Sequence, residues 1–371
     1  MPSNERIVIK LGTSTLTGGE KKLSHPRLVD LARQVSTLQT AGRQVVVVSS
    51  GAIAAGRETL GSPSLPKYLP AKQMLAAIGQ PRLMAIYAQY FAIYNQRVAQ
   101  VLLTRADLAN RRRYLNARDA IEALLHQKVI PIINENDTVA TEEIRIGDND
   151  NLSALVANLL EADLLLLLTD QDGLYTADPR SDPQARLIHE VGPEPFSANL
   201  WQAAGGTDTG LGTGGMLTKL QAADLARHGG TTVVIARGSE PDAILRLAQG
   251  EALGTRLLPV INKVESRKRY ILSGSLSGRA NELTVDAGAA RALARGGSLL
   301  PAGLTQVAGE FERGDTVRVA GPSGKLVAAG LSNYTSADLL KLSGRQSSEI
   351  ETILGYTFGD EVIHRSNMVL V

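Results

Sequence analysis

Two lysines and a glycine-rich loop are the residues of this chain best suited to binding phosphate. Lys10 ends an apolar run just before Gly12, and Lys219 closes the glycine-rich segment Thr213–Lys219. Glycines let backbone N–H groups approach an oxyanion closely, and an ammonium group supplies the opposing charge. The order of Thr218 and Lys219 departs from the Walker pattern G-x-x-x-x-G-K-[ST]. The sequence therefore predicts a phosphate cradle of another type, with the two lysines bracketing a triphosphate.

Each of these features also has a simpler interpretation. Lys10 could be an ordinary lysine at the edge of a sheet, and the glycines could form a flexible surface loop. A lysine in the first turns of a helix is unfavourable for the helix dipole, however, and a nearby anion would account for Lys219.

Two polar segments of the first half of the chain could hold an amino-acid substrate. Asp137 lies in IINENDTV, and Asp148, Asn149 and Asp150 lie together in IGDNDNLSALVANLL, where a strand or hairpin gives way to a helix. A solvated acidic helix start is the alternative, because Asp favours the first turn. In the functional interpretation, Asn and backbone amides suit an amino acid, and an Asp pairs with its ammonium group or orients a catalytic lysine.

Two further turns follow apolar runs. Ser50 and Gly51 lie in SSGAIAAG, where a tight turn that opens a helix would aim free N–H groups at a phosphate or a carboxylate. A plain serine N-cap explains this segment equally well. Asp170 lies in LLTDQDGLYTADPR, a weaker signal because Asp-Gly turns are common.

The elements that would position these residues alternate between strand and helix. Nearly continuous Val, Ile and Leu predicts strands buried on both faces of a parallel sheet, at residues 6–12, 44–51, 128–137, 163–170 and 231–238. Helical patterns lie between them, at residues 25–42, 70–100 and 114–127, and a further helix starts at Met216. In such open α/β sheets ligands gather beyond the carboxyl ends of the strands, where all the candidate residues fall.

The pattern changes after about residue 250. Residues 251–274 read as a linker with a basic cluster, and short strands with Gly-rich turns follow. This spacing predicts a small, mainly β domain.

Composition excludes several classes of protein. The 371 residues include no cysteine, so disulfides, thiol nucleophiles and thiolate metal sites are excluded. The first residues lack the apolar region of a signal peptide, and the run 164–168 is too short to span a bilayer. We expect a cytoplasmic enzyme without membrane contact. The five histidines show no metal-ligand spacing.

The motifs, taken in order, resemble those of the bacterial glutamate 5-kinases of the amino acid kinase superfamily. The resemblance covers essentially the full length through VIKLGTST, VVVVSSGAIAAG, PIINENDTV, GDNDNLSALVA, LLTDQDGLYTADPR and GTGGMLTKLQAA. The tail LTVDAGAARALARGGSLLPAGL is similar to the PUA domain that these enzymes carry. The resemblance implies an amino acid kinase domain at 1–255, a linker at 256–278 and a PUA domain at 279–371.

The resemblance also implies a role for each candidate residue. Lys10, Lys219 and Asp150 would be catalytic, with Asp150 organising the two lysines. L-glutamate would be held by Ser50, Gly51, Asp137, Asp148 and Asn149. ATP would be bound by Lys10, Thr169, Asp170, Thr213, Gly214, Gly215, Met216, Leu217, Thr218 and Lys219. At Leu217 many relatives have a small polar residue, so a side-chain contact to phosphate is not expected there.

The implied reaction transfers the γ-phosphoryl group of ATP, with Mg²⁺, to the side-chain carboxylate of glutamate. A carboxylate with a pKa near ~4.3 is already ionised at neutral pH and needs no general base. The resemblance further implies feedback inhibition by proline, a homodimer or homotetramer, and transfer of the labile acyl phosphate to glutamyl phosphate reductase on the route to proline.

Three other classes of protein share some of these features. Acetylglutamate, aspartate and uridylate kinases share the lysine and glycine elements but lack the PUA tail. An RNA-binding protein is disfavoured, because residues 280–371 contain eight Lys/Arg against ten Asp/Glu and phosphate-backbone binding needs a basic face. A small-molecule sensor would leave both lysines unexplained.

Overall fold

The computed structural model describes residues 5–62, 68–140, 148–205, 215–262 and 281–370, and for residue 148 only the backbone. The chain forms two compact units, one of residues 1–109 and 117–262 and the other of residues 110–116 and 263–371. Each unit has a sheet of its own.

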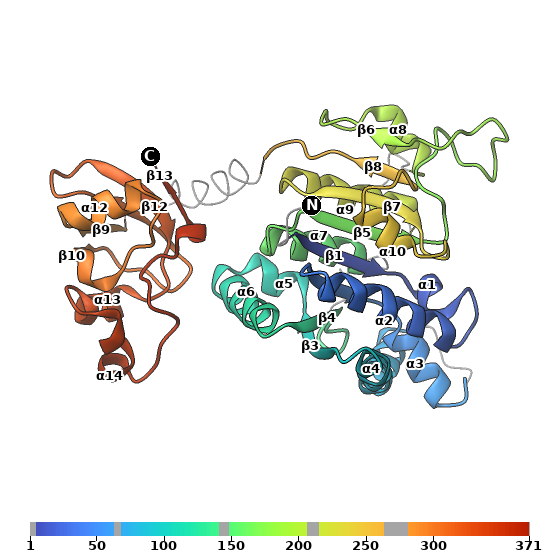
Figure 1. The fold of residues 1–371 in the computed structure, drawn as a ribbon, viewed down its shortest axis with the longest axis horizontal. Helices are drawn as coiled ribbons and strands as arrows, with labels where there is room; N and C mark the ends of the chain where they lie inside the picture. The colour runs from blue at the N-terminus through green and yellow to red at the C-terminus, as the bar shows by residue number, and fades with distance from the viewer. Residues whose placement is uncertain (1–4, 63–67, 141–147, 206–214, 263–280, 371) are drawn as a thin grey trace. The chain divides into compact units, whose positions relative to one another are not determined.

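The first unit is built on a large, mostly parallel sheet with the strand order β3-β4-β2-β1-β5-β7-β8-β6 (Figure 1). The bounds are β1 Arg6–Leu11, β2 Gln44–Ser49, β3 Arg97–Leu103, β4 Val129–Glu135, β5 Leu164–Thr169, β6 Glu190–Val191, β7 Thr232–Arg237 and β8 Thr255–Leu257. Neighbouring strands are parallel except β7 and β8. The expected open α/β sheet is confirmed.

Helices cover both faces of this sheet. The helices in this part of the chain are α1 Thr13–Thr17, α2 His25–Thr40, α3 Ala52–Thr59, α4 Leu69–Ala92, α5 Arg105–Ala109, α6 Arg111–His126, α7 Asp148–Leu159, α8 Ala198–Ala203, α9 Met216–His228 and α10 Ala243–Ala248, and the first residues of α6, up to 116, belong to the second unit. One layer is formed by α2, which packs against α4 and α10, and the other by α7, which packs against α9.

The alternation of side chains along β1 decides which layer Lys10 faces. Ile7, Ile9 and Leu11 belong to the hydrophobic core that includes residues of α2, α4 and α10. Successive side chains of a strand point to opposite faces, so Val8 and Lys10 face the layer of α7 and α9. The one charged residue among these apolar neighbours is thus directed at the helices that carry the other candidate residues.

The expected helix over residues 70–100 is wrong beyond Ala92. There α4 ends, and after a short turn the strand β3 begins at Arg97. Asn95 takes a left-handed φ of 55°, which cannot continue a helix, and the residues after it pair in parallel with β4. Strands β6 and β8 are also absent from the sequence-based expectation, and β8 lies inside the stretch that reads as a linker.

The second unit contains a smaller sheet with the order β10-β9-β11-β12-β13. Its elements are β9 Glu282–Val285, β10 Leu304–Ala308, β11 Thr316–Ala320, β12 Leu326–Leu331 and β13 Met368–Leu370, with α12 Ala287–Ala294, α13 Ser336–Leu342, α14 Ile350–Leu354 and the 3₁₀ helices η1 Pro301–Gly303, η2 Ser347–Glu349 and η3 Arg365–Asn367. Its separate apolar core includes Leu283, Val319, Tyr334 and Ile363. The expected small C-terminal β domain is confirmed.

None of the helices in the described ranges has the length and hydropathy needed to cross a membrane.

Candidate functional site

The first turn of α7 carries the carboxylate on which both candidate lysines converge. Asp150 is 2% exposed. The Nζ of Lys10, on β1, lies 2.6 Å from its Oδ1, and the Nζ of Lys219, on α9, lies 3.3 Å from its Oδ2. Residues 209 positions apart in the chain are therefore joined through one side chain.

The start of α9 completes this cluster. Gly215 precedes the helix with φ 130° and ψ −149°, a conformation that is essentially restricted to glycine. Thr218, in the first turn of α9, donates a hydrogen bond from Oγ1 to the Oδ2 of Asp150 at 2.9 Å. The hydroxyl of Thr218, expected from the resemblance to bind ATP, thus serves the carboxylate that holds the lysines.

Burial and charge act in opposite directions on the pKa values of this cluster. Burial would raise the pKa of Asp150, but the charges of Lys10 and Lys219 and the hydrogen bonds from Lys10 and Thr218 together hold it below its ordinary value. Burial lowers the pKa of Lys10, with the charge of Lys219 adding to the effect and that of Asp150 opposing it. Two ammonium groups around one carboxylate leave a net positive charge, which an anionic ligand would balance.

Asn149, the neighbour of Asp150, connects α7 to β4 and to the residue that follows β2. Its Nδ2 donates to the Oγ of Ser50 at 3.0 Å and to the Oδ1 of Asn134 at 3.1 Å. The N–H of Ser50 in turn donates to the carbonyl of Leu11 at 3.0 Å, which ties the end of β2 to the end of β1. The first turn of α7 therefore meets the carboxyl ends of β1, β2 and β4.

The turn after Ser50 depends on its glycine. Gly51 precedes α3 with φ 100°, in the left-handed region, and a Cβ there would lie 3.0 Å from the Cδ1 of Leu16. The two serines before it divide between the two faces of the sheet. Ser49 is fully buried and its Oγ lies 2.7 Å from the hydroxyl of Tyr87 on α4, whereas Ser50 faces Asn149.

The other expected ATP residues in the described part of the chain lie at the carboxyl end of β5 and at the start of α9. Thr169 is buried as the last residue of β5, and its Oγ1 donates to the Oδ1 of exposed Asp170 at 3.0 Å. Met216 and Leu217 form the first turn of α9. Thr213 and Gly214 lie outside the described residues.

Asp137 and Asp148 are the two remaining residues expected to bind the substrate. Asp137 lies half-buried in the turn that follows β4. Asp148 is the first residue of α7, and its side chain lies outside the described part of the chain.

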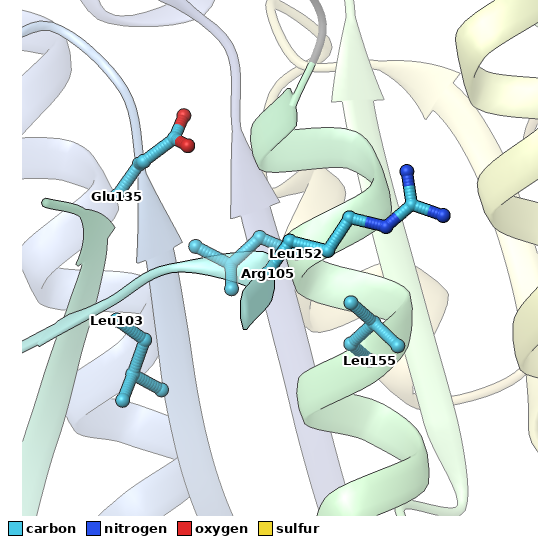
Figure 2. Close-up of a pocket in the computed structure, with 5 residues that line it drawn as sticks. All are labelled: Leu103, Arg105, Glu135, Leu152 and Leu155. Atoms are coloured by element: carbon cyan, nitrogen blue, oxygen red, sulfur yellow. The ribbon is translucent and has the colours of Figure 1, made fainter. Parts of the chain in front are cut away.

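A small recess lies where α7 packs against β3, β4 and α5 (Figure 2). It is lined by Leu103 of β3, Arg105 of α5, Glu135 of β4, and Leu152 and Leu155 of α7. The guanidinium of Arg105 points away from Glu135. The space is too small for a water molecule, and we assign no ligand to it.

Two residues next to the site were not singled out from the sequence. Asn134 is 2% exposed within β4, and Gln80 is 8% exposed on α4. The Nδ2 of Asn134 donates to the Oε1 of Gln80 at 2.8 Å. A signal for Asn134 was available, since an asparagine inside an otherwise apolar buried strand needs hydrogen-bond partners.

Comparison with known proteins identifies the family of this chain. The model of the amino acid kinase family matches residues 5–237, and that of the PUA domain matches residues 281–354. The chain belongs to the amino acid kinase family. The protein is thus a kinase, with a PUA domain as its second, smaller unit.

Several curated members of the family resemble the chain over its whole length, and each of the following is named glutamate 5-kinase. The protein from Photobacterium profundum is 53% identical over 372 residues, covering 100% of this chain and 97% of that protein. The one from Shewanella amazonensis is 54% identical over 99% of this chain and 96% of that protein. The one from Deinococcus radiodurans is 53% identical over 99% of this chain and 100% of that protein.

Proposed function

We propose that the protein transfers the γ-phosphoryl group of ATP to the side-chain carboxylate of L-glutamate, giving L-glutamyl 5-phosphate and ADP. The observation that carries the proposal is the Lys10–Asp150–Lys219 cluster. Its surplus positive charge is buried at the carboxyl ends of the strands, where a triphosphate would balance it. The names of the relatives support glutamate as the acceptor and a place in proline biosynthesis.

The proposed reaction needs charge stabilisation more than proton transfer. An oxygen of the ionised glutamate side chain attacks the γ-phosphorus, and the bond from that phosphorus to the bridging oxygen of ADP breaks. No proton moves in this step. The site must hold two anions in line and neutralise charge in the transition state, which suits ammonium groups held rigidly by a buried carboxylate.

Within the part of the chain that the structure describes, no protein site for Mg²⁺ is evident. The described residues present no group of three or more histidine or carboxylate side chains placed to hold a metal ion, and each oxygen of Asp150 already has an ammonium group beside it. Mg²⁺ commonly binds through substrate phosphates and water, with few protein ligands. We therefore propose that the ion enters with ATP, where it would neutralise phosphate charge.

An ADP-release assay with L-glutamate, N-acetylglutamate, aspartate and UMP as acceptors tests the proposal. We expect turnover with L-glutamate, and trapping of the acyl phosphate by hydroxylamine as a hydroxamate. Turnover confined to UMP or N-acetylglutamate would refute glutamate as the acceptor. Inhibition by proline, a homo-oligomeric state, a cytoplasmic location and transfer of the product to a reductase stay predictions.

A further inference from the structure

Four side-chain amides form a hydrogen-bonded chain that runs from the outside of the sheet to the site. Gln100, exposed on the edge strand β3, accepts from the Nε2 of Gln80 at 3.1 Å. The Oε1 of Gln80 accepts from the Nδ2 of Asn134, and the Oδ1 of Asn134 accepts from the Nδ2 of Asn149. The chain thus links α4, on one face of the sheet, to α7 on the other.

Two backbone groups determine which end of each amide is oxygen. The N–H of Glu135 donates to the Oδ1 of Asn134 at 2.8 Å, and a backbone N–H can only donate. The carbonyl of Ser49 accepts from the Nδ2 of Asn149 at 3.4 Å, and a carbonyl can only accept. With the oxygen and nitrogen of these two amides assigned, the NH₂ group of Asn134 must donate to Gln80, and the side-chain oxygen of Gln80 must accept.

This assignment leaves one acceptor unused beside the lysine cluster. The Oδ1 of Asn149 is buried and has no hydrogen-bond partner among the described residues. A buried acceptor without a partner is costly, and the missing partner has to be a donor. The ammonium group of an amino acid, with three N–H donors, fits this requirement, whereas a carboxylate does not.

We propose that Gln80 is a positioning residue for substrate selectivity. By accepting from the Nδ2 of Asn134 it acts together with the N–H of Glu135 to hold that amide in the orientation that binds the NH₂ group of Asn149. It thereby helps to keep the oxygen of Asn149 available to the α-ammonium group of the substrate. Gln80 itself does not touch the substrate. This inference rests on the proposed use of L-glutamate.

Two substitutions of Gln80 distinguish the effect of its hydrogen-bond acceptor from the effect of its side-chain size. Gln80→Met keeps the length but removes the acceptor, whereas Gln80→Glu keeps an acceptor for Asn134 in either protonation state. The readout is the ratio of kcat/KM for L-glutamate to that for glutarate, which lacks the amino group. We expect Gln80→Met to lower this ratio roughly tenfold, with kcat at saturating substrates and KM for ATP unchanged. Gln80→Glu should keep the ratio within about threefold.

A merely structural role predicts the opposite order, because a carboxyl group buried on α4 disturbs the fold more than a methionine does. Thermal melting of each variant records that effect separately. Gln89→Met, the same change at an exposed position of α4, is the matched control and should alter neither ratio nor melting.

A wild-type ratio in Gln80→Met would overturn the inference, as would an equal loss in both Gln80 variants. If Gln80→Met does not fold, Gln80→Glu is sufficient as a test: a reduced ratio of kcat/KM for L-glutamate to that for glutarate in this variant would overturn the inference. Failure of the wild-type protein to phosphorylate L-glutamate would instead remove the proposed function beneath it.

Discussion

Replacing Asp150 by asparagine removes the negative charge that holds the two lysines together while keeping the shape of the side chain. With an effective dielectric constant of about 20, the attractions at 2.6 Å and 3.3 Å amount to about 6 and about 5 kcal/mol. Desolvation offsets much of this, and the loss of one partner from a buried ion pair costs about 3–5 kcal/mol. We expect Asp150→Asn to lower the free energy of unfolding by that amount at neutral pH.

The same substitution should lower kcat at least about 10²-fold, because the two ammonium groups would repel each other and leave their positions around the phosphate. KM for ATP should not rise by a comparable factor, because removal of the carboxylate increases the net positive charge of the cluster and so favours binding of the anionic nucleotide.

The effect on stability should depend on pH in a defined direction. The pKa of Asp150 is lower in the folded protein than its ordinary value, which is about 3.9 in an unfolded chain. Its stabilising contribution is therefore complete above about pH 4 to 5 and is lost as the pH falls through the folded pKa. The difference in stability between the wild type and Asp150→Asn should be constant near neutrality and narrow in acid.

Urea unfolding across this pH range, together with steady-state kinetics, measures both effects. Glu251→Gln is the matched control, because Glu251 forms a solvent-screened surface ion pair with Arg246 and its loss should leave stability close to that of the wild type. If Asp150→Asn also stayed within about 1 kcal/mol of the wild type and turned over normally, the buried cluster would not have the role argued for it.

Three further substitutions test other parts of the site. Lys219→Ala should reduce kcat on the order of 10²-fold with the fold retained, and near-normal turnover would remove Lys219 from the catalytic residues. Asp137→Ala should raise KM for L-glutamate, and an effect on ATP alone would assign this residue to the other half of the site. Gly79→Ala should lower the free energy of unfolding by roughly 1–3 kcal/mol or more in guanidinium, because the added Cβ would lie 1.8 Å from the carbonyl oxygen of Ala52 where α4 crosses α3. Wild-type stability in Gly79→Ala would show that the two helices can separate without loss.

Much of the first unit could be predicted because its signals are local. In the apolar runs that form β1, β2, β4, β5 and β7, almost every residue is apolar, which by itself indicates a strand buried on both faces. The observed ends of these strands lie within two residues of the expected ones. Strand β3 was missed because a helical pattern runs up to it and the chain reversal at Asn95 has no strong sequence signature. The strands β6 and β8 are only two and three residues long, too short to show a period.

The sequence by itself determined which residues have chemistry to offer, namely two lysines, a carboxylate and a glycine turn, and that each follows or opens an element of a parallel sheet. Only the tertiary structure decided that Lys10 and Lys219 share Asp150, that Thr218 serves the same carboxylate, and that Gln80 and Asn134 orient Asn149. Periodicity reports how each residue meets its own neighbours along the chain. The partners of a buried polar atom come from distant segments, and their identity depends on strand order and on which face each side chain takes.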